Sequence, residues 1–212
     1  FLVVGILYLD EYKKNLIEAE LSGLLTQTEM FAVALSESAV ARAPSGRYRV
    51  SKISNQMVRR LVQTAGVRAR LFGVDGSLIA DSRRLVGSSG TVSIEQLPPP
   101  DDHASPLGQT LSLLERLMNQ ILGTRRYPPY REKVQQKAHD YSEVVAALSG
   151  ERVKSVRELD RDQLLLTVAV PVQRYKQVLS GLLVTKDSKG IDVALYETRR
   201  DILKGFAVAF AL

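Results

Sequence analysis

The stretch that decides the fold is Gln163 to Lys186, QLLLTVAVPVQRYKQVLSGLLVTK. Its first part, Leu164–Val172, is apolar almost throughout. Such a run predicts a strand that is covered on both faces and lies centrally in a sheet. The second part, Val178–Thr185, alternates more regularly, and Gln173–Gln177 between the two parts is polar. The stretch therefore predicts two antiparallel strands joined by a polar loop.

A proline and a glycine in this hairpin indicate how its strands are placed in the sheet. Pro171 cannot donate a hydrogen bond to a neighbouring strand, so we expect it at a strand end or at a bulge. Gly181 has no side chain, so we expect another part of the chain to approach the second strand closely at this point.

Three further strands complete the predicted sheet. Val67–Gly73 and Ser77–Asp81 flank the turn signal Asp75-Gly76, which predicts a second hairpin. Arg152–Arg157 predicts one more strand, directly before the stretch quoted above. Five strands in a 2 + 3 split, with helices between them, predict an α+β domain with one antiparallel sheet.

Apolar periodicity predicts helices around this sheet. The longest runs from 10 to 43 and ends where Pro44 and Gly46 break it. Shorter helices are expected at 54–65, 106–122 and 141–148, and an exit helix at 191–204. The sheet and its connections, 54–187, form the core of the predicted domain.

The long helix carries an apolar stripe with a heptad-like spacing over roughly three heptads. The candidate residues are Ile17, Leu21, Leu24, Phe31 and Leu35. One interpretation is that this stripe packs on the protein's own sheet. The other is that it forms the seam of a parallel homodimer. Both hold if one half of the helix packs inward and the other half pairs, and the sequence leaves the choice open.

Both ends of the sequence are apolar and uncharged, FLVVGILYL at 1–9 and FAVAFAL at 206–212. Each is far shorter than the roughly 20 residues that span a bilayer. We expect 1–9 to be the end of one transmembrane helix and 205–212 the start of another, with 10–204 as an extracytoplasmic domain between them. Two buried helix ends are the alternative.

Composition and motifs exclude several classes of function. The net charge of +6 is modest for 212 residues and only 6% of them are aromatic, which argues against nucleic-acid binding. The absence of cysteine excludes disulfides and thiolate sites. The sequence holds no phosphate-binding loop, kinase signature or nucleophile elbow, so we expect no enzyme in this segment.

Several collinear blocks resemble one family of membrane sensors. They are LVVGILYLDEYKKNLIEAELSGLLTQTE (Leu2–Glu29), ARLFGVDGSLIADSRRL (Ala69–Leu85), YSEVVAALSG (Tyr141–Gly150), VAVPVQRYKQVLSGLLVTKDSKGID (Val168–Asp192) and TRRDILKGF (Thr198–Phe206). The order of elements is similar to PAS-like periplasmic sensor domains of the Cache or PDC type. The blocks resemble the ChvG/ExoS/BvrS-type sensor histidine kinases of α-proteobacteria most closely.

The resemblance implies a periplasmic input domain of a dimeric two-component kinase in the bacterial inner membrane. A cytoplasmic part outside this segment would bind ATP and phosphorylate a response regulator. The family is tied to acid and envelope responses, and some members are held off by a periplasmic repressor protein. The alternatives are a binding module of the cell envelope for a ligand or a protein, or the input domain of a chemoreceptor or cyclase.

Acid responses require a group that changes charge in the working range. Histidine does so unaided, whereas a carboxylate needs a pKa raised by burial or by a like-charged neighbour. The candidates for proton sensing are Asp81, Asp101, Asp102 and His103. The last three also offer oxygen and imidazole ligands, but a solvated loop is the favoured interpretation, and we expect neither a metal nor another cofactor in the segment.

PAS-like domains commonly bind small molecules between the sheet and its connecting segments. Arg70 and Arg83 are candidates to meet an anion there, and Tyr127 and Tyr130 to line an aromatic wall. A protein partner in place of a small molecule remains the alternative.

Overall fold

The computed structural model describes residues 2–38, 40–42, 48–50, 54–63, 65–83, 127–133, 135–160, 163–188 and 190. The chain divides into two compact units, Phe1–Leu85 with Pro128–Leu212, and Val86–Tyr127. Of the second unit only Tyr127 is described. The helices predicted at 106–122 and 191–204, and the segment 205–212, lie outside the described residues.

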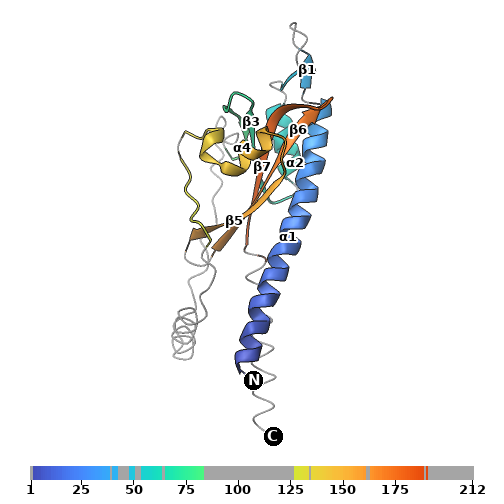
Figure 1. Ribbon diagram of the computed structural model, residues 1–212. Coiled ribbons are helices and arrows are strands. Elements are labelled where there is room, and N and C mark those ends of the chain that lie inside the picture. Colours follow the sequence, from blue (N-terminus) through green and yellow to red (C-terminus); the bar gives the residue numbers. More distant parts are fainter. Residues whose placement is uncertain are drawn as a thin grey trace. The chain divides into compact units, whose positions relative to one another are not determined.

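The first unit contains the predicted five-stranded antiparallel sheet, in the order β4-β3-β7-β6-β5 (Figure 1). The strands are β3 (Arg68–Gly73), β4 (Leu78–Asp81), β5 (Val153–Asp160), β6 (Gln163–Arg174) and β7 (Gln177–Asp187). The α+β class and both hairpins are confirmed. The first half of the hairpin quoted above forms β6, which is buried along most of its length between β7 and β5.

The loop of this hairpin is shorter than the sequence predicts. The polar segment Gln173–Gln177 is not a loop, because β6 continues to Arg174 and β7 begins at Gln177. The turn consists of Tyr175 and Lys176, with φ of 48° and 63°. Two consecutive positive φ values are typical of a type I′ turn, whose twist matches that of the strands.

Pro171 and Gly181 lie opposite each other in the pairing of β6 with β7. The last β5–β6 pair is Val153 with Ala169, so Pro171 lies where β6 has a neighbour on one side only. A Cβ on Gly181 would lie 3.4 Å from side-chain carbons of Val144 and Leu148. The expected close approach at Gly181 is therefore confirmed, and the approaching element is helix α4 (Ser142–Leu148).

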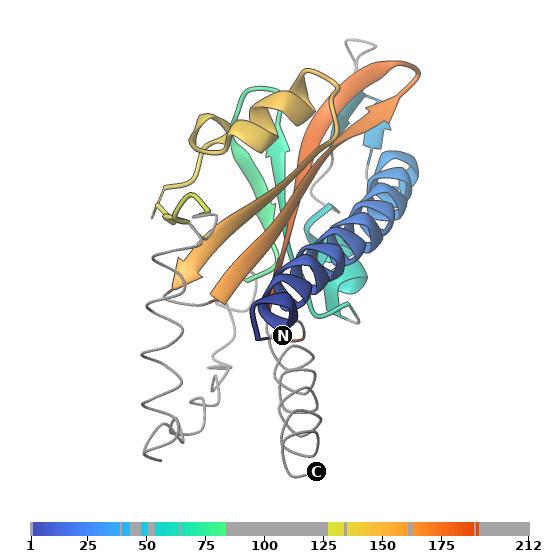
Figure 2. The ribbon, with the colours of Figure 1, turned by 60° about the horizontal axis from the view of Figure 1, so that its bottom comes forward.

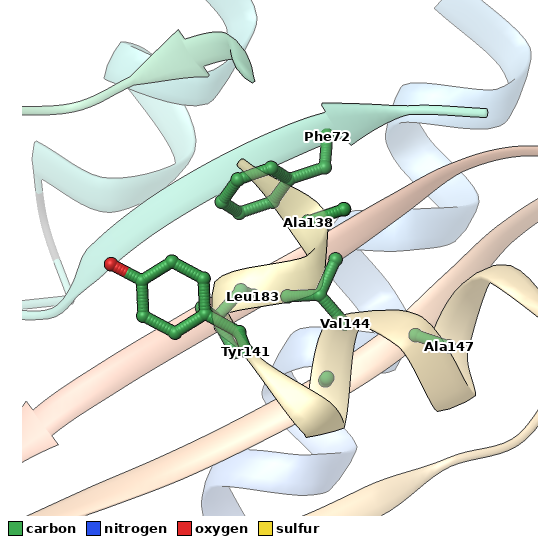
Figure 3. Close-up of a cluster of buried hydrophobic side chains, with 7 residues drawn as sticks. Phe72, Ala138, Tyr141, Val144, Ala147 and Leu183 are labelled. Carbon is green, nitrogen blue, oxygen red and sulfur yellow. The ribbon is translucent and has the colours of Figure 1, made fainter. Parts of the chain in front are cut away.

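Helices α1 (Leu2–Ser38) and α4 cover opposite faces of the sheet (Figure 2). Both pack on β6 and β7. The α4 side is closed by a cluster in which Val144 and Ala147 meet residues of three strands and the segment before the helix (Figure 3). The remaining members of this buried cluster are Phe72, Ala138, Tyr141, Ala169 and Leu183.

Helix α1 ends five residues earlier than the predicted boundary at Ala43, so that part of the prediction is wrong. Val40–Arg42 forms strand β1, which pairs with β2 (Tyr48–Val50). Valine and tyrosine favour strands, and Pro44 and Gly46 lie between the two segments. Helix α2 (Ser54–Gln63) then follows, close to its predicted position, and contacts β3 and β4.

A helix begins already at Leu2, so the apolar start of the chain is continuous with α1. Within the described part of the chain, no helix combines the length and the apolar character that a membrane span requires. The transmembrane assignments of 1–9 and 205–212 stay predictions.

Candidate functional site

The charged residues on the α4 face of the sheet begin with Arg68 on β3. Its Nε donates to Asp81 Oδ1 at 3.1 Å and its Nη2 to Asp81 Oδ2 at 2.7 Å. The same guanidinium donates from Nη1 and Nη2 to the two carboxylate oxygens of Glu132, at 2.9 and 2.8 Å. Arg68 is thus bidentate to two carboxylates, the geometry that gives arginine its strongest pairs.

This pairing sets the protonation states of the three groups. Burial alone would raise the pKa of Asp81, but hydrogen bonds from Arg68 and from the Arg83 amide outweigh it, so the pKa lies below its ordinary value. The hydrogen bond from Arg68 likewise lowers the pKa of Glu132. Burial opposes the charge on Arg68, yet its hydrogen bonds to both carboxylates raise its pKa further. All three groups are therefore charged in mild acid.

The proton-sensing expectation changes for Asp81. A sensing carboxylate needs a raised pKa, whereas the pKa of Asp81 is lowered by its partners. Its side chain is buried and links β4 to β3 through Arg68. The expectation accordingly depends on Asp101, Asp102 and His103, which lie outside the described residues.

Arg70 lies two residues further along β3 and is 0% exposed. Its Nη1 donates to the hydroxyls of Tyr130 and Tyr141, at 3.0 and 2.9 Å, and to Gln136 Oε1 at 3.2 Å. Its guanidinium carbon also lies 4.7 Å from the centre of the Tyr141 ring. Its Nε and Nη2, by contrast, have no hydrogen-bond partner among the residues that the structure describes.

Tyr141 is held between this guanidinium and the apolar cluster. Its ring tilts against Phe72, with 5.8 Å between the ring centres. Burial is the main reason why the pKa of Tyr141 rises to about 12, although the charge of Arg70 acts in the opposite direction. The phenol therefore stays protonated at any physiological pH.

A second buried carboxylate, Glu143, lies at the start of α4. Ser155 Oγ donates to its Oε1 at 2.5 Å, and Arg157 Nη2 donates to both oxygens at 2.7 and 2.9 Å. Burial opposes the charge of Glu143, but the hydrogen bonds from Ser155 and Arg157 hold its pKa below the ordinary value. The pair ties α4 to the edge strand β5.

The predicted pocket residues are brought together only in part. Arg70 and Tyr130 are in direct contact. The side chain of Arg83 is exposed, and its backbone amide donates to Asp81 Oδ1 at 3.0 Å. Tyr127 is half-buried and belongs to the unit Val86–Tyr127, whereas Arg70 belongs to the other unit. The anionic ligand and the aromatic wall stay predictions.

The candidate dimer residues on α1 face inward. Ile17, Leu21, Leu24 and Leu35 are buried on the sheet and Phe31 is half-buried. The sequence left two interpretations open. These four side chains agree with the first, in which the stripe packs on the protein's own sheet. Over residues 11–37 of α1, whose side chains the structure describes, the exposed large apolar side chains are Met30 and Val33.

Ion pairs along both sides of this stripe join α1 to the sheet. Lys186 Nζ on β7 lies 3.0 Å from Glu20 Oε2, and Lys154 on β5 pairs with Glu18. Arg152, just before β5, lies 3.1 Å from Glu29 Oε1. A displacement of the sheet relative to α1 would break these pairs.

Six residues of the charged network were not among the sequence candidates. They are Arg68, Glu132, Gln136, Tyr141, Glu143 and Arg157. One signal in the sequence could have identified Arg68 and its neighbour Arg70 as buried residues that need hydrogen-bond acceptors. Arg68, Arg70 and Phe72 alternate with apolar residues on a strand next to the central hairpin, so a sheet covered on both faces has to bury the arginines and supply acceptors. Among the described residues there is no group of three or more potential metal ligands.

A family model for a stimulus-sensing domain matches residues 51–161, about half of the sequence. The chain belongs to the stimulus-sensing domain family. It is 33% identical, over 98% of its length, to the sensor protein ChvG of Agrobacterium fabrum and to that of Rhizobium meliloti. The chain spans 39% and 40% of the length of these two relatives. The resemblance inferred from the collinear blocks is confirmed.

Proposed function

We propose that this stimulus-sensing domain is the periplasmic input domain of a two-component sensor histidine kinase in the bacterial inner membrane. The observation that carries the proposal is the match over 98% of the chain to two ChvG sensor proteins. In this proposal a cytoplasmic kinase part binds ATP and phosphorylates a response regulator. The domain itself contributes no catalytic group. Its PAS-like character, proposed from the order of its elements, fits a sensing role.

The route of the signal follows from what α1 contacts. Its apolar stripe packs on β6 and β7, and its acidic residues pair with Lys154 and Lys186 on β5 and β7. A stimulus that shifts the sheet changes the position of α1, which we propose to continue into the membrane. Such a shift biases a two-state equilibrium between inactive and active kinase. A homodimer, with contacts on the exposed side of α1, is part of the proposal.

Acid and envelope stress are the stimuli we propose, with a periplasmic repressor protein as a further partner. The arginine-paired carboxylates Asp81, Glu132 and Glu143 have lowered pKa values, so they stay ionised in mild acid and are unsuited to report it. The proton-sensing group is therefore proposed among Asp101, Asp102 and His103.

The test is autophosphorylation of the full-length protein in lipid vesicles, measured as a function of pH. We expect phosphorylation to change between pH 7 and pH 5.5, and the change to disappear when Asp101, Asp102 and His103 are replaced together by Asn, Asn and Gln. Replacing the exposed Glu37 by Gln serves as the matched control. An intact acid response in the triple variant contradicts the sensing assignment, and the absence of any autophosphorylation contradicts the kinase assignment.

An envelope binding module without an enzyme, or the input domain of a chemoreceptor or cyclase, is the second candidate function. The sequence that follows Leu212 in the full-length protein decides between these and a kinase. A histidine-kinase core there supports the proposal, and a different output domain replaces it.

A further inference from the structure

Arg70 differs from Arg68 and Arg157, two half-buried arginines of the sheet, in how its bidentate edge is used. That edge consists of Nε and Nη2, the pair of nitrogens that can donate hydrogen bonds to both oxygens of one carboxylate. In Arg68 this edge holds Asp81, and in Arg157 it holds Glu143. In Arg70 the same two nitrogens are fully buried and have no partner within the described part of the chain.

Asp81 and Glu132, two carboxylates on which the charge of Arg70 acts, are already paired with Arg68. Asp81 lies directly opposite Arg70 in the pairing of β3 with β4, yet both of its oxygens accept from Arg68. Both oxygens of Glu132 accept from Arg68 as well, and Gln136 Nε2 donates to one of them at 2.6 Å. Two carboxylates thus accept hydrogen bonds from Arg68, whereas Arg70, among the described residues, donates only to neutral acceptors.

The guanidinium of Arg70 is also fixed in orientation. Three neutral acceptors hold Nη1, and the rings of Tyr141 and Tyr130 lie 4.7 and 6.0 Å from the guanidinium carbon. A guanidinium that is held at one end and flanked by aromatic rings presents its other edge in one direction. This is the pre-organisation expected of a binding group.

From these contacts we propose that the Nε/Nη2 edge of Arg70 binds a small oxyanion, either a carboxylate or a phosphate-type group. The ligand is small because Arg70 is 0% exposed and lies beneath the segment that supplies Tyr130, Gln136 and Tyr141. A large partner cannot reach a side chain that this segment covers. A charge-assisted bidentate pair satisfies donors that otherwise stay unpaired in the protein interior.

Binding at this edge has a structural consequence for the segment that carries Tyr130, Gln136 and Tyr141. The segment is attached to the sheet by hydrogen bonds from the Tyr130 amide to Glu158 O, at 2.7 Å, and from the Ala138 amide to Gly76 O, at 2.9 Å. An oxyanion on Arg70 stabilises the closed arrangement of this segment on β3. The proposal names the ligand class of the sensing domain, and it rests on the proposed function only for its effect on signalling.

The direct test is NMR of the 212-residue chain, labelled with ¹⁵N in arginine and titrated with acetate, succinate or phosphate against chloride of equal ionic strength. We expect a saturable shift of the Arg70 Nε–H signal and no comparable shift for Arg68 or Arg157, whose edges are occupied. Acetate and succinate identify a carboxylate ligand, and phosphate identifies a phosphate-type ligand. The Arg70 signal is assigned by its loss in Arg70→Lys or by its displacement in Tyr141→Phe.

An Arg70 signal that is unmoved by all three anions overturns the proposal, as does a shift of equal size for every arginine. The Tm of the chain provides a second readout. It should rise with the concentration of the binding anion in the wild type and in Arg157→Lys, and stay constant in Arg70→Lys. Because both measurements report binding and not phosphorylation, a negative result leaves the assignment as a kinase input domain in place.

Discussion

The two faces of the central sheet, one packed against α1 and the other against α4, are built from different chemistry. The α1 face is aliphatic, with residues such as Leu166, Val168 and Leu182, and its charges lie only at the rim of the helix. The α4 face buries Arg70 and the carboxylates of Asp81 and Glu143. An aliphatic face fixes the position of a helix without demanding particular partners. A face of buried charges responds to anything that supplies or removes a hydrogen-bond partner.

The largest effect is expected where the aliphatic face is damaged. Leu35→Ala removes a side chain of α1 that is 1% exposed, and such truncations cost about 2–5 kcal/mol. Met30 lies on the outer side of the same helix and is 65% exposed, so Met30→Ala should change stability by less than about 0.5 kcal/mol. Urea denaturation of both variants measures the difference. Equal losses would contradict the inward orientation of the stripe.

A somewhat smaller loss is expected from the charged face. Asp81→Asn keeps the shape of a buried side chain but leaves one edge of Arg68 without a carboxylate, which should cost about 2–3 kcal/mol. Glu37→Gln changes an exposed carboxylate and should have almost no effect. If both variants unfold at the same urea concentration as the wild type, the Arg68–Asp81 pair contributes nothing to stability.

The pH dependence of stability follows from the same pairs. Asp81, Glu132 and Glu143 have folded-state pKa values below their ordinary values, so their contribution is complete above about pH 5 and is lost as the pH falls through the lowered pKa values. We expect urea midpoints at pH 7 and pH 5.5 to agree, and a fall below about pH 4 that is smaller in Asp81→Asn. A large loss between pH 7 and pH 5.5 would show that a buried group titrates there.

The smallest change is expected at the turn of the central hairpin. Lys176 has a φ of 63°, which costs little for glycine, so Lys176→Gly should stabilise the chain by about 0.5–1 kcal/mol. Lys176→Ala retains a Cβ at the same φ and should give no gain. Thermal unfolding of the two variants distinguishes them, and an equal Tm would argue against strain at this turn.

The sequence predicted those parts of the fold that depend on local patterns, and it missed those that depend on pairing between distant segments. Continuous apolar runs and the Asp75-Gly76 turn signal are local patterns, and they predicted the sheet and both hairpins. The turn at Tyr175 and Lys176 carries no glycine or asparagine, so local chemistry suggested a longer loop. The end of α1 was misplaced because β1 forms only through its pairing with β2, which local helix propensity does not represent.

The candidate site shows the same limit. Arg70 and Tyr130 were predicted together because an arginine and a tyrosine suit an anion pocket, and they are in contact. Their neighbours Gln136 and Tyr141 are more than 60 positions from Arg70, so their contact depends on how the chain returns to β3. The lowered pKa of Asp81 was not predicted either. It depends on hydrogen bonds from Arg68, and the sequence does not show toward which carboxylate the Arg68 side chain is directed.

The central claim is that the sheet passes a stimulus to α1, and the Lys186–Glu20 pair offers the most direct test. Autophosphorylation of the full-length protein should be measured with and without stimulus for Glu20→Lys, Lys186→Glu and the variant carrying both changes. Loss of an exposed pair is worth up to about 1 kcal/mol, or about five-fold in an equilibrium. We predict that each single reversal changes the ratio of stimulated to basal phosphorylation by about two- to five-fold, that the double reversal restores it, and that Glu11→Gln leaves it unchanged. Ratios that stay equal in all variants of folded protein would contradict the claim.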